Sequence, residues 1–109
     1  MTEVERAWAA GFWDGEGCAT HTSHDYAQAQ LNQVDRSVLE TFRNVVGGVI
    51  RGPYQYPRAS RPNSRPQFQW SVVGYQPVLR LARILWPYLG TVKRDQFKRI
   101  LQAHLAWRT

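Results

Sequence analysis

The amino-acid sequence predicts an α+β fold in which helices pack on one face of an antiparallel β-sheet. Segments with apolar residues at helical spacing alternate with segments of alternating polarity, and glycine and proline separate them. The predicted order is αββαββα followed by a terminal helix, and no internal repeat is present. A length of 109 residues corresponds to one domain, so residues 1–109 are expected to fold as a single unit.

The first half of the chain predicts a helix, a hairpin and a second helix. Residues 2–12 are helical because apolar residues recur there at helical spacing, namely at Val4, Trp8, Gly11 and Phe12. Residues 18–23 and 26–33 are rich in threonine, tyrosine and glutamine, which predicts the hairpin. Asp35 is the expected N-cap of the second helix, which ends at the glycines at 47 and 48. Within the hairpin, Cys18 is expected to be a small apolar filler and His21 to face the core.

The second half predicts two more strands and two more helices. Residues 49–55 form a strand that is interrupted by glycine and proline, and a proline-rich basic loop follows it with Arg58, Arg61 and Arg65. Residues 67–73 alternate in polarity and form the fourth strand. Helices are expected over about residues 75–85 and 93–107, the last with its inward side made by Phe97, Ile100, Leu101, His104 and Leu105.

Period-two alternation predicts a sheet with one apolar and one polar face. Ala27, Ala29 and Leu31 share one side of their strand, which is the core side. Glutamine and asparagine can pair with adenine edges and arginine with guanine, so the other face is expected to read bases in DNA, an ordinary polar surface being the alternative. The expected DNA-binding residues of this face are Thr20, Thr22, Gln28, Gln30, Asn32, Arg51, Gln67, Gln69 and Ser71.

The charge of the chain favours a polyanionic partner over a small-molecule substrate. The formal net charge is +6, and the isoelectric point is near 10.1. Arginine outnumbers lysine, which suits phosphate and guanine contacts but also follows from a GC-rich genome. The single cysteine excludes an intramolecular disulfide, and no apolar stretch approaches the length of a membrane span. A soluble, intracellular protein that binds double-stranded DNA and no membrane is therefore expected.

Two acids, Asp14 and Glu16, stand where the first helix ends, and there a negative charge opposes the helix dipole. A carboxylate beside a DNA-reading sheet can bind Mg²⁺, which lowers the pKa of bound water and stabilises the oxygens of phosphodiester cleavage. One such acid per chain is too few, so two chains related by a two-fold axis are expected to supply one each. The expected dimer interface is the small-residue stripe of Ala7, Ala10, Gly11 and Asp14, with packing against the chain's own sheet as the alternative.

The stretch "AAGFWDGEG" at residues 9–17 resembles the signature of the LAGLIDADG homing endonuclease family, whose members often have L-A-G-F-x-D-G-E-G. Seven of the nine positions are identical, Trp13 occupies the free position, and Ala9 departs from the usual leucine. The segments "VDRSVLETFRNVVGG" and "YLGTVKRDQF" are also similar to this family, so the resemblance spans nearly the whole chain.

The resemblance implies a single-motif homodimer whose sheets form a saddle over a roughly palindromic target. It implies that Glu16 is the metal-binding acid, with the Gly15 carbonyl as a further ligand, and that Asp14 is structural. It also implies that Gln33 orders water and that Lys93 lies near the scissile phosphate, although Lys93 equally fits a surface lysine. Arg51 either flanks the site or reads bases, and His24 is expected near the DNA.

The sequence therefore favours a homodimeric, intron-encoded or free-standing homing endonuclease that cuts double-stranded DNA with Mg²⁺, for which Mn²⁺ can substitute. The resemblance further suggests short 3′ overhangs. One alternative is a cleavage-inactive module of the same fold, either an intron maturase or a DNA-binding regulator. Another is an interaction protein in which the first helix only mediates dimerisation.

Overall fold

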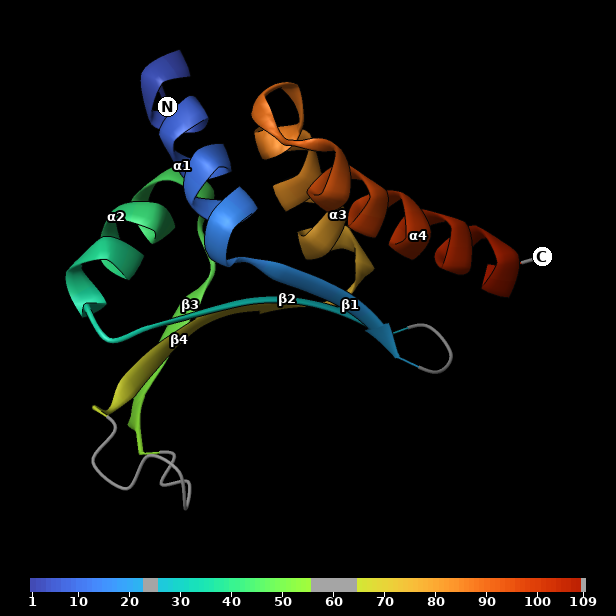
Figure 1. Ribbon diagram of the computed structural model, residues 1–109. Coiled ribbons are helices and arrows are strands. Elements are labelled where there is room, and N and C mark those ends of the chain that lie inside the picture. The colour runs from blue at the N-terminus through green and yellow to red at the C-terminus, as the bar shows by residue number, and fades with distance from the viewer. Residues whose placement is uncertain (23–25, 56–64, 109) are drawn as a thin grey trace.

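The computed structural model describes residues 1–22, 26–55 and 65–108 and confirms the predicted α+β architecture (Figure 1). The helices and strands follow in the predicted order, and the first and last helices extend further than expected. Their bounds are α1 (Glu3–Glu16), β1 (Cys18–Thr22), β2 (Tyr26–Gln33), α2 (Arg36–Val46), β3 (Val49–Tyr54), β4 (Gln67–Val73), α3 (Tyr75–Leu85), the 3₁₀ helix η1 (Trp86–Tyr88) and α4 (Thr91–Arg108).

The four strands form one antiparallel sheet in the order β1-β2-β4-β3. All helices pack on one side of this sheet, and its other side is concave and open (Figure 1). The open side is called the outer face below. Because side chains alternate across a strand, the register assigns every second residue of each strand to the outer face.

Aromatic rings fill the core between α1, α2, α4 and the sheet. Trp13 is stacked on Phe42 and Phe97 with centroids 6.2 and 6.0 Å apart, and Trp70 meets Phe42 edge-on at 4.8 Å. The indole N–H of Trp70 donates to the Gly47 carbonyl at 2.7 Å. A Cβ atom on residue 48 would lie 2.4 Å from the Nε1 atom of the same indole, which is too close. The packing of Trp70 therefore requires glycine at position 48, just after α2.

Side chains satisfy the first backbone N–H groups of two helices. Thr2 and Glu5 form a reciprocal capping box at the start of α1. Asp35 caps α2 as predicted, since its carboxylate accepts from the Ser37 N–H at 2.9 Å. The side-chain and backbone hydrogen bonds from Ser37 hold the pKa of Asp35 below its usual value. These caps fix where α1 and α2 begin relative to the sheet.

The orientation of α1 differs from the expected one. Val4 is 80% exposed, Trp8 is also exposed, and the buried side consists of Ala9, Ala10 and Trp13. The large ring of Trp13 enters the core, and Ala9 and Ala10 are buried in the same core cluster. Of the predicted stripe, Val4, Trp8 and Gly11 therefore face away from the core within the single chain. Phe12 packs partly against the core and meets Phe42 edge-on.

Three further expectations about the core, for Cys18, Leu101 and Leu105, were wrong. Cys18 is exposed, because its place in the β1–β2 register puts it on the outer face opposite Gln30. His21 lies on the helix-covered face as predicted, because it pairs with the buried Ala27 and its ring lies 6.4 Å from that of Tyr75, but it is exposed at the edge of the sheet. Leu101 and Leu105 of α4 are also exposed, because among the described side chains of this helix the ones buried in the core are Phe97 and Ile100.

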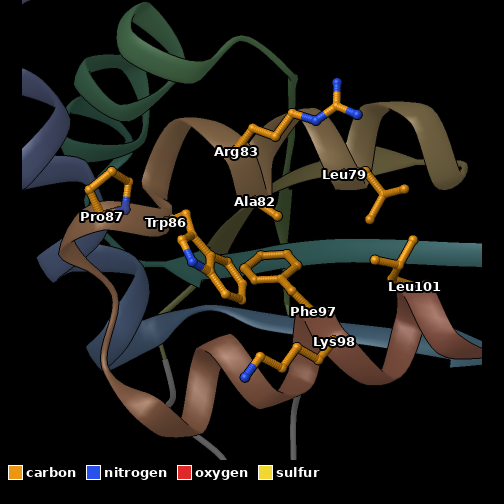
Figure 2. Close-up of a pocket in the computed structure, with 8 residues that line it drawn as sticks. All are labelled: Leu79, Ala82, Arg83, Trp86, Pro87, Phe97, Lys98 and Leu101. Carbon is orange, nitrogen blue, oxygen red and sulfur yellow. The ribbon is translucent and has the colours of Figure 1, made fainter.

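A shallow apolar groove of about 430 Å³ separates α3 from α4 (Figure 2). Trp86, Phe97 and Leu101 are among its lining residues, and none of the predicted site residues lines it. In the described part of the chain, no helix has the length and apolar character needed to cross a bilayer.

Candidate nucleic-acid interface and active site

The outer face brings together most residues predicted to bind DNA. In one row across the strands, Asn32 of β2 pairs with Gln69 of β4, which pairs with Arg51 of β3. In the next row Gln30 lies between Cys18 and Ser71. Every described member of the predicted set is at least partly exposed and belongs to the outer face by register: Thr20, Gln28, Gln30, Asn32, Arg51, Gln67, Gln69 and Ser71.

Three glutamines of the outer face form a hydrogen-bonded group. The Nε2 of Gln28 donates to the Oε1 of Gln30 at 2.8 Å, and the Nε2 of Gln69 donates to the same oxygen at 3.2 Å. Gln28 neighbours Gln30 along β2, and Gln69 is its diagonal neighbour on β4. We call these three residues the amide cluster.

The outer face also contains residues that were not predicted as DNA contacts. Tyr26, Val49 and Val73 are exposed and share this face by register, together with Cys18. The same period-two alternation that selected the glutamines includes all four positions. Amide and arginine side chains predict base readout by hydrogen bonds, whereas Val49 and Val73 can contact bases only through apolar groups such as the thymine methyl group.

Some predicted DNA-binding residues cannot be placed. His24, Arg58 and Arg61 lie outside the described residues, as does the side chain of Thr22. Arg65 is exposed just before β4 begins. Among the described residues neither Arg65 nor Arg51 forms an ion pair, so both guanidinium groups are available to an anion.

The two acids at the end of α1 have different environments. Both carboxylate oxygens of Asp14 accept from the Gly90 N–H, at 3.1 and 2.9 Å. Gly90 precedes α4, and its carbonyl accepts from the Arg94 N–H, so Asp14 supplies a negative charge at the N-terminus of that helix. Glu16 is exposed and has no hydrogen bond or ion pair with any described residue.

Lys93 contacts the residue that follows Glu16. Its Nζ donates to the carbonyl of Gly17, the residue that follows Glu16 and connects α1 to β1. An ammonium group at this position complements the negative end of the α1 dipole. The carbonyl of Gly15 belongs to the last turn of α1, where carbonyls have no partner within the helix. Glu16, the Gly15 carbonyl and the Lys93 amine therefore all belong to the region where α1 joins the edge strand β1, and among the described residues no ion pair joins Glu16 to Lys93.

Gln33 is not brought into contact with these groups. It ends β2, is half-buried, and shares by register the face of Ala29 and Leu31, which is the helix-covered side. No hydrogen bond between described residues joins it to Glu16 or Lys93. Within the described chain, no three histidine, cysteine or acidic residues come together as a complete metal site.

The predicted dimer stripe is only partly available to a partner. Ala10 is 0% exposed and packs in the core of its own chain, so its assignment to the interface was wrong. Asp14 is half-buried, with its carboxylate on Gly90 of the same chain. Ala7 is half-exposed and Gly11 is exposed, and a Cβ on residue 11 would meet no atom within 4 Å. The open side of α1 consists instead of Val4, Trp8, Gly11 and Gly15, spaced four, three and four residues apart.

No family model matches the chain, and no curated protein matches it in sequence. Solved structures are similar over nearly its whole length. One is the homing endonuclease I-CvuI in complex with the I-CreI target, with a TM-score of 0.72 and 24% identity over 98% of this chain and 69% of that chain. Another is the homing endonuclease I-TnaI, with a TM-score of 0.66 and 22% identity over 89% of this chain and 69% of that chain.

The LAGLIDADG meganuclease I-AabMI bound to uncleaved DNA is also similar, with a TM-score of 0.67 and 24% identity. That match covers 90% of this chain but 35% of the meganuclease, so this chain spans about a third of it. The predicted α+β fold, with its αββαββα order, is present in the chain, and these structures share that fold. The chain has the fold of the LAGLIDADG homing endonucleases.

Proposed function

We propose that the protein is one subunit of a homodimeric, divalent-metal-dependent endonuclease that cuts double-stranded DNA at a specific site. The observation that carries the proposal is the position of Glu16. This unpaired, exposed carboxylate lies where α1 meets the edge strand of a sheet whose outer face is lined with base-reading side chain types. A net charge of +6 suits a polyanion at this face. The similar structures of I-CvuI and I-AabMI contain DNA, which agrees with this reading.

The residues at the end of α1 fit a hard divalent cation in part. The Glu16 carboxylate and the Gly15 carbonyl are oxygen donors, which Mg²⁺ and Ca²⁺ prefer. A single chain supplies too few of them, and a second Glu16 together with DNA phosphate oxygens would complete the set. When bound, the cation supplies Lewis-acid chemistry that stabilises negative charge at the phosphodiester. I-CvuI was crystallised with target DNA in the presence of Mg and of Ca.

The other residues predicted for this site would supply a positive charge, position α1 relative to α4, and order water. Lys93, held by the Gly17 carbonyl, places a positive charge beside Glu16, where it would offset charge that develops on the scissile phosphate. Asp14 is a positioning residue, because its contact with Gly90 joins the end of α1 to the start of α4, and α4 carries Lys93. We propose that Gln33 orders water only in a complex in which DNA or a partner subunit changes its surroundings.

The open side of α1 is the proposed dimer interface. Val4 and Trp8 expose apolar surface, and Gly11 and Gly15 offer no side chain that would hold a second helix away. A two-fold axis along this stripe would bring both Glu16 residues together and extend the outer face across two half-sites. A two-fold dimer predicts a roughly palindromic target.

Gly11→Leu is expected to yield monomers by analytical ultracentrifugation, whereas Gly11→Ala, with its smaller side chain, is expected to retain more dimer.

The direct test is cleavage of a selected DNA target with Mg²⁺ or Mn²⁺ by the wild-type protein and by Glu16→Gln. The variant is expected to bind the target with unchanged affinity in the absence of divalent metal. Its cleavage rate should fall by at least about 100-fold, because an electrostatic contribution to the transition state is lost. A wild-type dimer that binds its site and never cuts would refute the nuclease proposal and favour a cleavage-inactive DNA-binding module.

A further inference from the structure

The hydrogen bonds within the amide cluster leave Gln30, its central residue, with free hydrogen-bond donors but no free acceptor on its side-chain amide. The Oε1 of Gln30 already accepts from two amide groups, those of Gln28 and Gln69. A carbonyl oxygen has two lone pairs, so these donors occupy its acceptor capacity. Between described residues no hydrogen bond uses the Nε2 of Gln30, so both of its hydrogens remain available.

A glutamine that recognises adenine needs both of its amide atoms. The bidentate pair donates from Nε2 to adenine N7 and accepts from adenine N6 at Oε1. Gln30 cannot complete this pair while Gln28 and Gln69 occupy its oxygen. Adenine would then turn its N6 donor toward an amide that can only donate. Guanine instead presents two adjacent acceptors, O6 and N7, to the two free hydrogens of Nε2.

We infer that Gln30 is a donor-only specificity residue that selects guanine over adenine, and that Gln28 and Gln69 enforce this choice. The inference rests on the proposed DNA-binding function of the outer face. The cluster is formed before DNA binds, so the orientation of the Gln30 amide is fixed at little additional entropic cost. Gln28 and Gln69 keep their own Oε1 atoms as acceptors on either side, where they can accept from the N4 donor of the paired cytosine.

Selection of binding sites from a double-stranded DNA library with randomised positions tests the inference without requiring cleavage. The wild-type protein should enrich guanine over adenine by about tenfold at one position of each half-site, within the range of one specific side-chain contact. Gln30→Ala should abolish the preference at this position and leave the others intact. The double variant Gln28→Met and Gln69→Met keeps side-chain length but frees the Gln30 oxygen, so the same position should change from guanine to adenine.

Gln67→Met is the matched control, because Gln67 lies on the same face, pairs with Tyr54 and has no bond to Gln30. It should leave the guanine preference at the Gln30 position unchanged. The inference is overturned if the wild-type protein selects adenine at the position that Gln30→Ala alters. It is also overturned if the double methionine variant still selects guanine there. If no position is enriched by any of these proteins and binding is insensitive to salt, the proposed function itself fails.

Discussion

The two sides of α1 contain small residues in similar number but have opposite environments. Ala9 and Ala10 are buried with Trp13 in the chain's own core, whereas Gly11 and Gly15 face open space on the side of the exposed Trp8. Small residues allow another element to approach a helix closely, and both sides of α1 contain such residues. Each side also has one tryptophan, so neither the small residues nor the size of the ring decides which side enters the core. What differs is that Trp13 packs against the rings of Phe42, Trp70 and Phe97.

The strongest test of this comparison replaces the two tryptophans separately. Trp13→Ala should reduce the free energy of unfolding by about 3–5 kcal/mol, because a fully buried ring that packs on three others is lost. Trp8→Ala should cost the single chain about 1 kcal/mol, because Trp8 stacks only on Phe12, at 5.5 Å. Urea unfolding at a protein concentration that keeps the chain monomeric measures both values. Equal losses would mean that the two sides of α1 are equally buried.

Enlarging the small residues of α1 sharpens the comparison. Ala10→Leu should destabilise the monomer by about 1–3 kcal/mol, because the core around residue 10 is closed. Gly11→Leu should stabilise the monomer by about 0.5–1 kcal/mol, because a Cβ there meets no atom and leucine favours helix over glycine. The two adjacent variants are matched in size and are compared by chemical denaturation. A stable Ala10→Leu chain would mean that residue 10 is open, as the sequence alone had suggested.

Most of the fold could be predicted from the sequence because it depends on local periodicity. The β2 pattern placed Ala27 and Leu31 in the core, and Asp35 marked the start of α2 correctly. The rotation of α1 could not be predicted in this way. Val4, Trp8 and Gly11 form a regular stripe, but Ala9, Ala10 and Trp13 form another, and only the packing of Trp13 against Phe42 and Phe97 distinguishes them.

The candidate site could be predicted as a set of residue types but not as a set of contacts. The glutamines of the outer face follow from alternation, whereas their bonds to one another depend on the β2–β4 register, which no local pattern reveals. The contacts of Asp14 with Gly90 and of Lys93 with Gly17 join residues 76 positions apart in the chain. Such contacts depend on how α4 packs near the end of α1.

The two acids at the end of α1 should respond differently to loss of charge. Asp14→Ala should cost about 0.5–2 kcal/mol, as removal of a helix cap does, because Gly90 loses its acceptor. Asp14→Asn keeps an acceptor oxygen but no charge, so a loss of about 0.3–1 kcal/mol is expected. Glu16→Gln removes a charge that opposes the α1 dipole and should leave the free protein unchanged or slightly stabilised. Thermal unfolding ranks the three variants, and a Glu16→Gln loss as large as that of Asp14→Ala would contradict the assignment.

The smallest expected effect is at the N-terminal end of α1, where the Tyr88 hydroxyl donates to the Glu3 carboxylate. This bond, with help from Arg6, lowers the pKa of Glu3 below its ordinary value of 4.5. The same bond raises the pKa of Tyr88 above its ordinary value of 10.0. Both side chains are exposed at the surface, so solvent screens the interaction and its contribution to stability is small.

The pH dependence of this contribution follows from the two shifts. A lowered carboxyl pKa stabilises the fold above pH 4.5, and that stabilisation is lost as the pH falls through the folded-state value of Glu3. A raised phenol pKa stabilises the fold below pH 10.0, and that stabilisation is lost as the pH rises through the folded-state value of Tyr88. The difference in urea midpoint between the wild type and Tyr88→Phe should therefore be constant between these limits and shrink beyond both. A difference that is equally large at pH 3 and pH 7 would mean that Tyr88 acts through packing alone.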